Sequence, residues 1–152
     1  MPRESGPSLP LSVDETDRLI DLHFPGIHVG GRTLVIEAVS DRTAHVRLLL
    51  TERNIRRGGT ISGPAMFMLA DFAIYVALIA TLGEPAIAAV TSNLNINFLL
   101  RPDPVELVAE ARLLRVGRRL AYAEVAITAA DGKDVMAHAT GTYALGRSGN
   151  PV

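Results

Sequence analysis

The sequence is 152 residues long, the length of one ordinary domain, and 48% of its residues are hydrophobic, as in a globular protein. Its formal net charge of -1 gives no sign of a nucleic-acid partner or of binding to an anionic membrane surface. The absence of cysteine excludes disulfides, thiol catalysis and cysteine-ligated metals, and it is consistent with the cytoplasm, where we expect this protein. Residues 1–17 contain no apolar core of a secretory signal peptide.

The N-terminal residues predict a loose segment followed by a short helix. Residues 1–11 are rich in Pro, Ser and Gly, so we expect a flexible segment there and a single domain over residues 12–146. Ser12, with Glu15 three residues later, matches a helix capping box, and Pro25-Gly26 would end the helix. The apolar side of this amphipathic helix is predicted to contain Leu19, Ile20, Leu22 and Phe24.

Two strands are predicted next, because apolar and β-branched residues fill residues 32–39 and 44–51. The link between them, Ser40-Asp41-Arg42, has the composition of a turn. Residues 52–62 then form a connecting loop that contains paired arginines and paired glycines.

A long uncharged stretch follows, in which Asp71 is the only formal charge between residues 58 and 83. Pro64 suits the first turn of a helix and Gly83 suits its C-terminal cap, so we predict one long helix over residues 63–82. A run of this length also raises the possibility of a membrane span. A charge in the middle of a span is costly, however, so we favour a helix buried on nearly all sides and no membrane partner.

Four strands are predicted after the long helix. The first, residues 88–100, alternates asparagines with apolar residues in a period of two, and Pro102 and Pro104 end it. Residues 147–152 are predicted to be a disordered tail. The other three strands and the turns between them are residues 105–116, Gly117-Arg118, 119–130, Asp131-Gly132 and 134–145.

The order of these elements predicts an α+β fold, in which an antiparallel sheet covers the long central helix and a short helix precedes them. A single sheet over one helix leaves a second apolar surface. We therefore expect a homodimer, or a dimer of dimers, to cover that surface.

The isolated carboxylate of Asp71 is the most informative feature for function. Burying a carboxylate among Met, Phe, Leu and Ile is costly unless a group pairs with it or a reaction uses it. The free amides at the start of the same helix can bind an anion or an oxyanion. Together these features suggest a catalytic acid or base beside an oxyanion hole. The alternative is a structural aspartate that pairs with an arginine or caps a neighbouring element.

Two motifs in this region resemble those of the hotdog-fold acyl-CoA thioesterases of the phenylacetic-acid-pathway type, in the 4-hydroxybenzoyl-CoA thioesterase superfamily. The family's central helix begins with His-Gly-Gly and continues, four residues later, with Leu-Ala-Asp. Here Ser62-Gly63-Pro64 and Leu69-Ala70-Asp71 occupy these positions, and residues 95–102 match the family's Asn-Ile-Asn-Phe-Leu-Arg-Pro strand with one extra Leu. Ser62 and Pro64 depart from the family's His and second Gly, and Arg56 stands where the family often has Asn.

The resemblance implies hydrolysis of a medium-chain or aryl acyl-CoA to the free acid and CoA, with no metal and no cofactor besides the CoA of the substrate. It implies that Asp71 is the general base or nucleophile and acts across a dimer interface on a substrate held by the other subunit. The backbone amide of Gly63 would bind the oxyanion, and Thr91 would help to hold the attacking water.

Four other residues are candidates for substrate binding. Ser62 could supply a hydroxyl, although an N-cap role explains it as well, and its surroundings are not a nucleophile elbow. Asn93 shares a strand face with Thr91 if alternation is regular. Arg118 and Arg119 suit the phosphates of CoA, and the alternative is a solvated basic turn. The spacings of the four histidines match no metal motif, so no metal site is predicted.

Two other functions stay open. The first is a hotdog protein that binds acyl-CoA without hydrolysing it, which the missing motif His and Asn favour. The second is a hotdog hydratase or dehydratase, whose sites usually pair an Asp with a His. No histidine lies near Asp71 in the sequence, which argues against the second.

Overall fold

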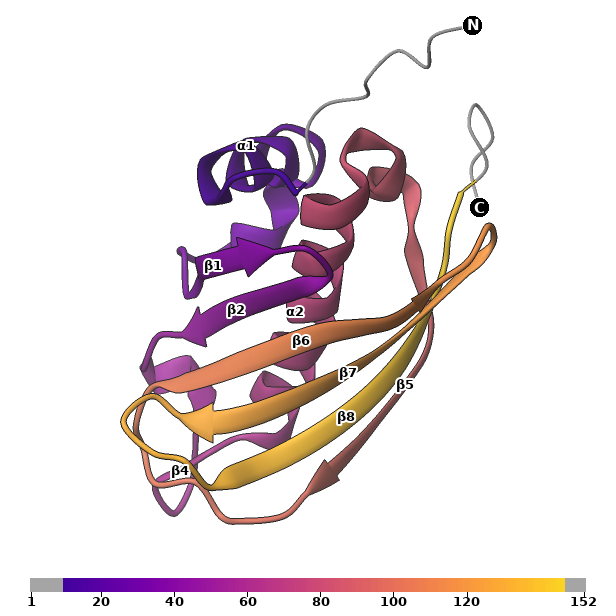
Figure 1. Cartoon of the computed structure of the whole chain (residues 1–152). Coiled ribbons are helices and arrows are strands. Elements are labelled where there is room, and N and C mark those ends of the chain that lie inside the picture. The colour runs from indigo at the N-terminus through magenta and orange to yellow at the C-terminus, as the bar shows by residue number, and fades with distance from the viewer. Residues whose placement is uncertain (1–9, 147–152) are drawn as a thin grey trace, which may run out of the picture.

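One side of a six-stranded antiparallel sheet packs against a 20-residue helix, α2 (Gly63–Leu82), as Figure 1 shows. The computed structural model describes residues 10–146. The strand order is β1-β2-β6-β7-β8-β5, and every neighbouring pair is antiparallel. The predicted α+β class, with one central helix and a short N-terminal helix, is confirmed. The strands are β1 (Leu34–Ser40), β2 (Thr43–Leu48), β5 (Val90–Phe98), β6 (Leu107–Val116), β7 (Leu120–Ala129) and β8 (Val135–Ala144).

The residues from which we predicted the ends of α2 form the caps of this helix in the structure. The Ser62 hydroxyl accepts a hydrogen bond from the Ala65 amide at 3.2 Å, and Pro64 lies in the first turn. Gly83 ends the helix with a φ of 73°, a conformation that favours glycine. By length and composition α2 could cross a membrane, but 72% of its apolar window is buried inside the fold, as in a core helix.

Small residues on the inner face of the sheet let α2 lie close to the strands. Gly141 of β8 is the tightest point, because a Cβ there would lie 2.8 Å from Ile74 Cδ1 and 2.9 Å from Leu94 Cδ1. Close packing of this kind excludes voids between helix and sheet. The buried small residues of the sheet are Ala44, Ala109, Ala111, Ala121, Ala123, Ala129, Ala137 and Ala139.

The short helix, α1 (Val13–His23), begins as predicted, because the Ser12 hydroxyl accepts a hydrogen bond from the Glu15 amide at 3.1 Å. Its predicted apolar side is partly wrong. Ile20 is buried, but the side chains of Leu22 and Phe24 are 72% and 49% exposed. Two residues correspond to about 200° of rotation, so Leu22 turns away from the core when Ile20 faces it.

The N-terminal segment joins the core earlier than the sequence predicts. Leu11 is buried, and its amide donates a hydrogen bond to the carbonyl of Ala80 at 2.8 Å. The rest of the flexible segment predicted over residues 1–11 falls almost entirely on residues 1–9, and the predicted tail is residues 147–152. Both of these ranges lie outside the described residues.

Several short elements between the main ones were not predicted. Within the connecting loop, two-residue strands form a small hairpin. One-turn 3₁₀ helices follow α1, precede that hairpin and follow α2. These elements are η1 (Pro25–His28), η2 (Glu52–Asn54), β3 (Ile55–Arg56), β4 (Thr60–Ile61) and η3 (Glu84–Ala88).

β5 is an edge strand of the main sheet. It pairs with β8 on one side, and no strand within residues 10–146 pairs with its other side. Phe98 at its end is exposed, and so are Leu99 and Leu100, which follow it. An unpaired apolar edge of this length is a template for pairing with another chain.

Candidate active site

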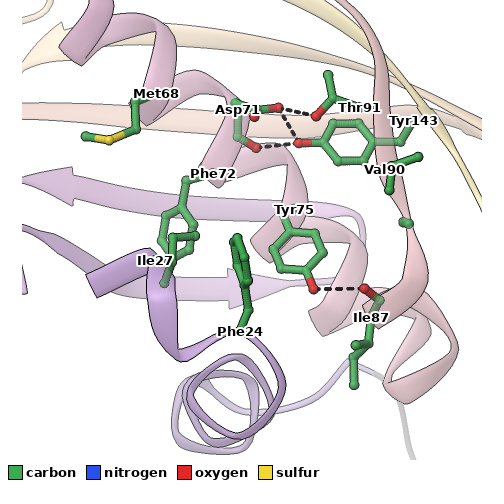
Figure 2. Close-up of a pocket in the computed structure, with 11 residues that line it drawn as sticks. Phe24, Ile27, Met68, Asp71, Phe72, Tyr75, Ile87, Val90, Thr91 and Tyr143 are labelled. Carbon is green, nitrogen blue, oxygen red and sulfur yellow. Dashed lines mark hydrogen bonds between the residues drawn. The ribbon is translucent and has the colours of Figure 1, made fainter. Parts of the chain in front are cut away.

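A cavity of about 460 Å³ opens beside the middle of α2, and Figure 2 shows the residues that line it. Most of its wall is apolar and comes from α2, from the segment after α1 and from the segment before β5. A concave, mainly apolar cavity with a few convergent polar groups is the usual form of a small-molecule site. The lining residues are Phe24, Ile27, Met68, Asp71, Phe72, Tyr75, Ile87, Ala89, Val90, Thr91 and Tyr143.

Asp71 reaches this cavity because of its position on α2. Met68, Asp71, Phe72 and Tyr75 follow the spacing i, i+3, i+4 and i+7, which places them along one face of a helix. Met68 and Tyr75 therefore lie on the same side of α2 as Asp71. The isolated carboxylate is thus presented at the wall of an apolar cavity.

Two hydroxyl groups hold the carboxylate of Asp71 (Figure 2). The Thr91 hydroxyl, on β5, donates to Oδ1 at 2.7 Å. The Tyr143 hydroxyl, on β8, hydrogen-bonds the same Oδ1 and lies 2.8 Å from the main-chain carbonyl oxygen of Asp71. No basic side chain of residues 10–146 forms an ion pair with Asp71, which argues against the structural alternative of an aspartate paired with arginine.

Tyr143 is a site residue that the sequence reasoning missed. Its side chain is buried, and burial, followed by the negative charge of Asp71, raises the pKa of its hydroxyl above the ordinary range. The hydroxyl therefore stays protonated and remains a donor at neutral pH. A signal was present, because the period of two in β8 places Tyr143 on the inner face with Ala139 and Gly141, where a buried tyrosine needs a polar partner.

Gly63, the predicted oxyanion donor, borders a second hollow of about 620 Å³. This hollow lies against the exposed side of α2 and the end of β5, and Asp71 and Met68 line it as well as the first cavity. Asp71 therefore lies between the two hollows. The residues around the second hollow are Gly63, Pro64, Phe67, Met68, Asp71, Ile96 and Phe98.

The Ser62 hydroxyl, a candidate for substrate binding, acts as the N-cap of α2. We expect Ser62→Ala to lower the free energy of unfolding by about 1 kcal/mol, the usual cost of losing such a cap. Urea denaturation of the two proteins measures this difference. Hydrolytic activity at a temperature where both proteins are folded should change little, and a large loss of activity without loss of stability would assign the hydroxyl to the substrate instead.

Asn93 does not lie on the same strand face as Thr91, so that prediction is wrong. The register between β5 and β8 shifts at this point, because Thr91 lies opposite Tyr143 whereas Asn93 lies opposite Thr142. Residues opposite one another in an antiparallel pair point to the same face, and Tyr143 and Thr142 point to different faces. Asn93 therefore faces away from the cavity.

Arg118 and Arg119 are exposed in the turn between β6 and β7. Neither lines the cavity beside Asp71 or the hollow beside Gly63. The arginines near Gly63 are instead Arg56 and Arg101, which border a third hollow with it. Over residues 10–146, no three His, Asp or Glu side chains are grouped so that they could hold a metal ion.

Comparison with known proteins points to one family. The model of the thioesterase superfamily matches residues 58–136 of this chain. A solved structure of a candidate thioesterase from Silicibacter is 32% identical, with 94% of this chain and 97% of that chain covered and a TM-score of 0.80. No curated protein matches the chain at a significant level.

Two further solved structures share this fold. A candidate thioesterase related to phenylacetic acid degradation, from Ralstonia eutropha, is 28% identical, with 74% of this chain and 84% of that chain covered and a TM-score of 0.67. Zebrafish thioesterase superfamily member 2 is 19% identical, and its TM-score of 0.76 over 90% of this chain and 99% of its own shows a shared fold.

Proposed function

Because the chain belongs to the thioesterase superfamily and is a thioester hydrolase with the hotdog fold, we propose that it cleaves a medium-chain or aryl acyl-CoA to the free acid and CoA. The observation that carries this proposal is the placement of Asp71. Its carboxylate lies at the boundary between an apolar cavity, suited to an acyl group, and an open hollow toward the helix N-terminus. A carboxylate in this position is available as a catalytic base or nucleophile.

The hydroxyls of Thr91 and Tyr143 give the two carboxylate oxygens of Asp71 different roles. Thr91 and Tyr143 both bind Oδ1, and no donor among the described residues binds Oδ2. We assign to Oδ2 either the removal of a proton from the attacking water or direct attack on the thioester carbon. When Asp71 acts as the base, the water oxygen bonds to the thioester carbon, the carbon–sulfur bond breaks, and the CoA thiolate leaves with the proton that Oδ2 removed from the water. When Oδ2 attacks directly, the carbon–sulfur bond breaks and an acyl anhydride forms on Asp71; a water molecule then hydrolyses this anhydride, which releases the free acid, restores the carboxylate and supplies the proton for the thiolate. Tyr143 and Thr91 act as positioning residues that fix the orientation of the carboxylate.

The oxyanion donor comes from a second copy of the chain in this proposal. Gly63 and Asp71 are eight residues apart in α2, which corresponds to about 12 Å along the helix axis. An oxyanion donor must lie about 3 Å from the oxyanion, and the base about 3 Å from the attacking water. Groups separated by about 12 Å in one chain do not meet these conditions at one thioester carbon.

Exposed side chains on α2 support a two-fold arrangement. If two antiparallel α2 helices place Gly63 of one copy opposite Asp71 of the partner subunit, residue 67 of each copy lies beside the symmetry axis. Phe67 and Met68 are 40% and 41% exposed on a helix that is otherwise largely buried. The neighbouring edge of β5 has no strand partner within the described part of the chain either. We therefore propose a homodimer, or a dimer of dimers, whose contact completes the site.

The removal of the Tyr143 hydroxyl tests its positioning role. We expect Tyr143→Phe to lower kcat by about 10–100-fold, the value of a hydrogen bond to a charged group. The loss should appear in kcat rather than in KM, because the hydroxyl contacts the reacting carboxylate. Tyr122→Phe, which alters an exposed tyrosine of β7, is the matched control. An unchanged kcat in Tyr143→Phe would leave the tyrosine a structural role only.

Release of free thiol from a panel of acyl-CoAs, by wild type and by Asp71→Asn, tests the proposed function. The non-catalytic alternative, which the departures from the family motif favour, predicts binding without thiol release. The hydratase alternative loses support, because none of the histidines, all of which lie within the described residues, lines the Asp71 cavity, and the polar partners of Asp71 there are Thr91 and Tyr143.

A further inference from the structure

We propose that Phe24 and Tyr75 form the end wall of the acyl cavity and set the longest acyl chain that the protein accepts. This inference rests on the proposed function only in assigning an acyl-CoA to the site. It names the residues that determine specificity, and it defines the acyl group as uncharged and apolar.

The two aromatic rings stand at the end of the cavity away from Asp71 (Figure 2). Tyr75 follows Asp71 by one helical turn, about 6 Å along α2. The Phe24 ring meets the Tyr75 ring edge to face, with centroids 6.4 Å apart and planes at 79°. The Tyr75 hydroxyl donates to the carbonyl of Ile87 at 3.1 Å, which holds the ring against the segment that follows α2. An acyl chain that extends from the thioester carbon therefore meets this pair.

The polarity of the wall defines the chemistry of the occupant. Among residues 10–146, Asp71 is the only charged residue that lines the cavity. The lining hydroxyls of Tyr75, Thr91 and Tyr143 already donate their protons to protein oxygens. A carboxylate or ammonium at the far end of the acyl chain would be desolvated there without a partner, which is costly. An alkyl or aryl group carries no such cost.

The volume fits the same class of acyl group. A dry cavity of about 150 Å³ is enough to bind benzene, so about 460 Å³ accommodates an aryl ring with its linker or an alkyl chain of medium length. Phe24 follows the last residue of α1 and is 49% exposed. Of the two residues of the end wall, Phe24 is therefore the one next to solvent, so changing its side chain should move the limit on chain length.

The test measures the Kd of straight-chain acyl-CoAs of increasing length by calorimetry, with Asp71→Asn present in every protein to prevent hydrolysis. With Phe24 intact, affinity should rise with chain length and then fall at the wall. Phe24→Ala should move the optimum to longer chains, and Phe24→Trp should move it to shorter ones, with about 10-fold or more for each methylene that no longer fits. Leu22→Ala is the matched control, because Leu22 is an exposed residue of α1 outside the cavity.

Several outcomes would overturn the inference. They are identical length profiles for Phe24→Ala and Leu22→Ala, equal affinity for a chain that ends in a carboxylate and for its methyl-ended analogue, or no binding of any acyl-CoA. Thermal melts check folding, and if Phe24→Ala does not fold, the direction of the shift in Phe24→Trp decides. Thiol release is measured separately, with the protein that retains Asp71. Length-dependent binding without thiol release would contradict the proposed hydrolysis but would still support the role of Phe24 and Tyr75 as the end wall.

Discussion

Asp71→Asn should lower kcat for acyl-CoA hydrolysis by about 10²–10⁴-fold, the range expected when a positioned acid–base group is lost. Asparagine has nearly the same shape as aspartate, and its carbonyl oxygen can still accept hydrogen bonds from Thr91 and Tyr143. The fold and the melting temperature should therefore be almost unchanged. The amide cannot take a proton from water, however, so the chemical step should fail.

Thiol release with saturating acyl-CoA measures this effect, and circular dichroism confirms that the variant is folded. Asp41→Asn, which alters an exposed aspartate in the turn between β1 and β2, serves as the control and should keep full activity. Turnover by Asp71→Asn within about threefold of wild type would remove Asp71 from the reaction, since loss of even the weakest acid–base contribution costs far more.

The second large effect is expected at Gly63, where Gly63→Pro should lower kcat by about 10²–10³-fold, the usual cost of one oxyanion donor. Proline removes the amide proton and is well tolerated at the first position of a helix. The extended conformation of Ser62, with ψ of 148°, is compatible with a following proline. The Cβ atom that a side chain adds there would lie 3.4 Å from the Phe98 ring, which is van der Waals contact.

Gly63→Ala separates the lost amide from the added carbon atom. Alanine introduces the same Cβ next to Phe98 and keeps the N–H group, so its kcat should stay within a few-fold of wild type. Equal losses in Gly63→Ala and Gly63→Pro would mean that crowding at Phe98, and not the amide, explains the effect.

The sequence predicted the elements whose ends carry strong local signals. Ser62, Pro64 and Gly83 mark both ends of α2, and its predicted bounds match the structure. The register shift near Asn93 was not predictable, because a bulge depends on how β5 pairs with β8. The exposed side of α1 was assigned wrongly because the hydrophobicity of Leu22 does not determine which face of the helix meets the core.

Some residues of the candidate site could likewise be predicted from local sequence signals, and others could not. Asp71 and Gly63 could be located from one helix, since an isolated charge and a helix start are both local features. Tyr143 is 72 residues from Asp71, and only the arrangement of β8 beside β5 brings its hydroxyl to the carboxylate. The composition of the basic turn at Arg118 and Arg119 suits the phosphates of CoA. Composition does not give the distance between this turn and the site, however.

We propose that each thioester is cleaved between Asp71 of one copy and Gly63 of another. Coexpression of Asp71→Asn and Gly63→Pro chains tests it most directly. Random pairing makes about half of the dimers mixed, and each mixed dimer has one site with both groups intact, so about one quarter of wild-type activity should return. Activity no higher than the mean of the two separate variants would contradict the claim, because it would place both groups in the site of a single chain.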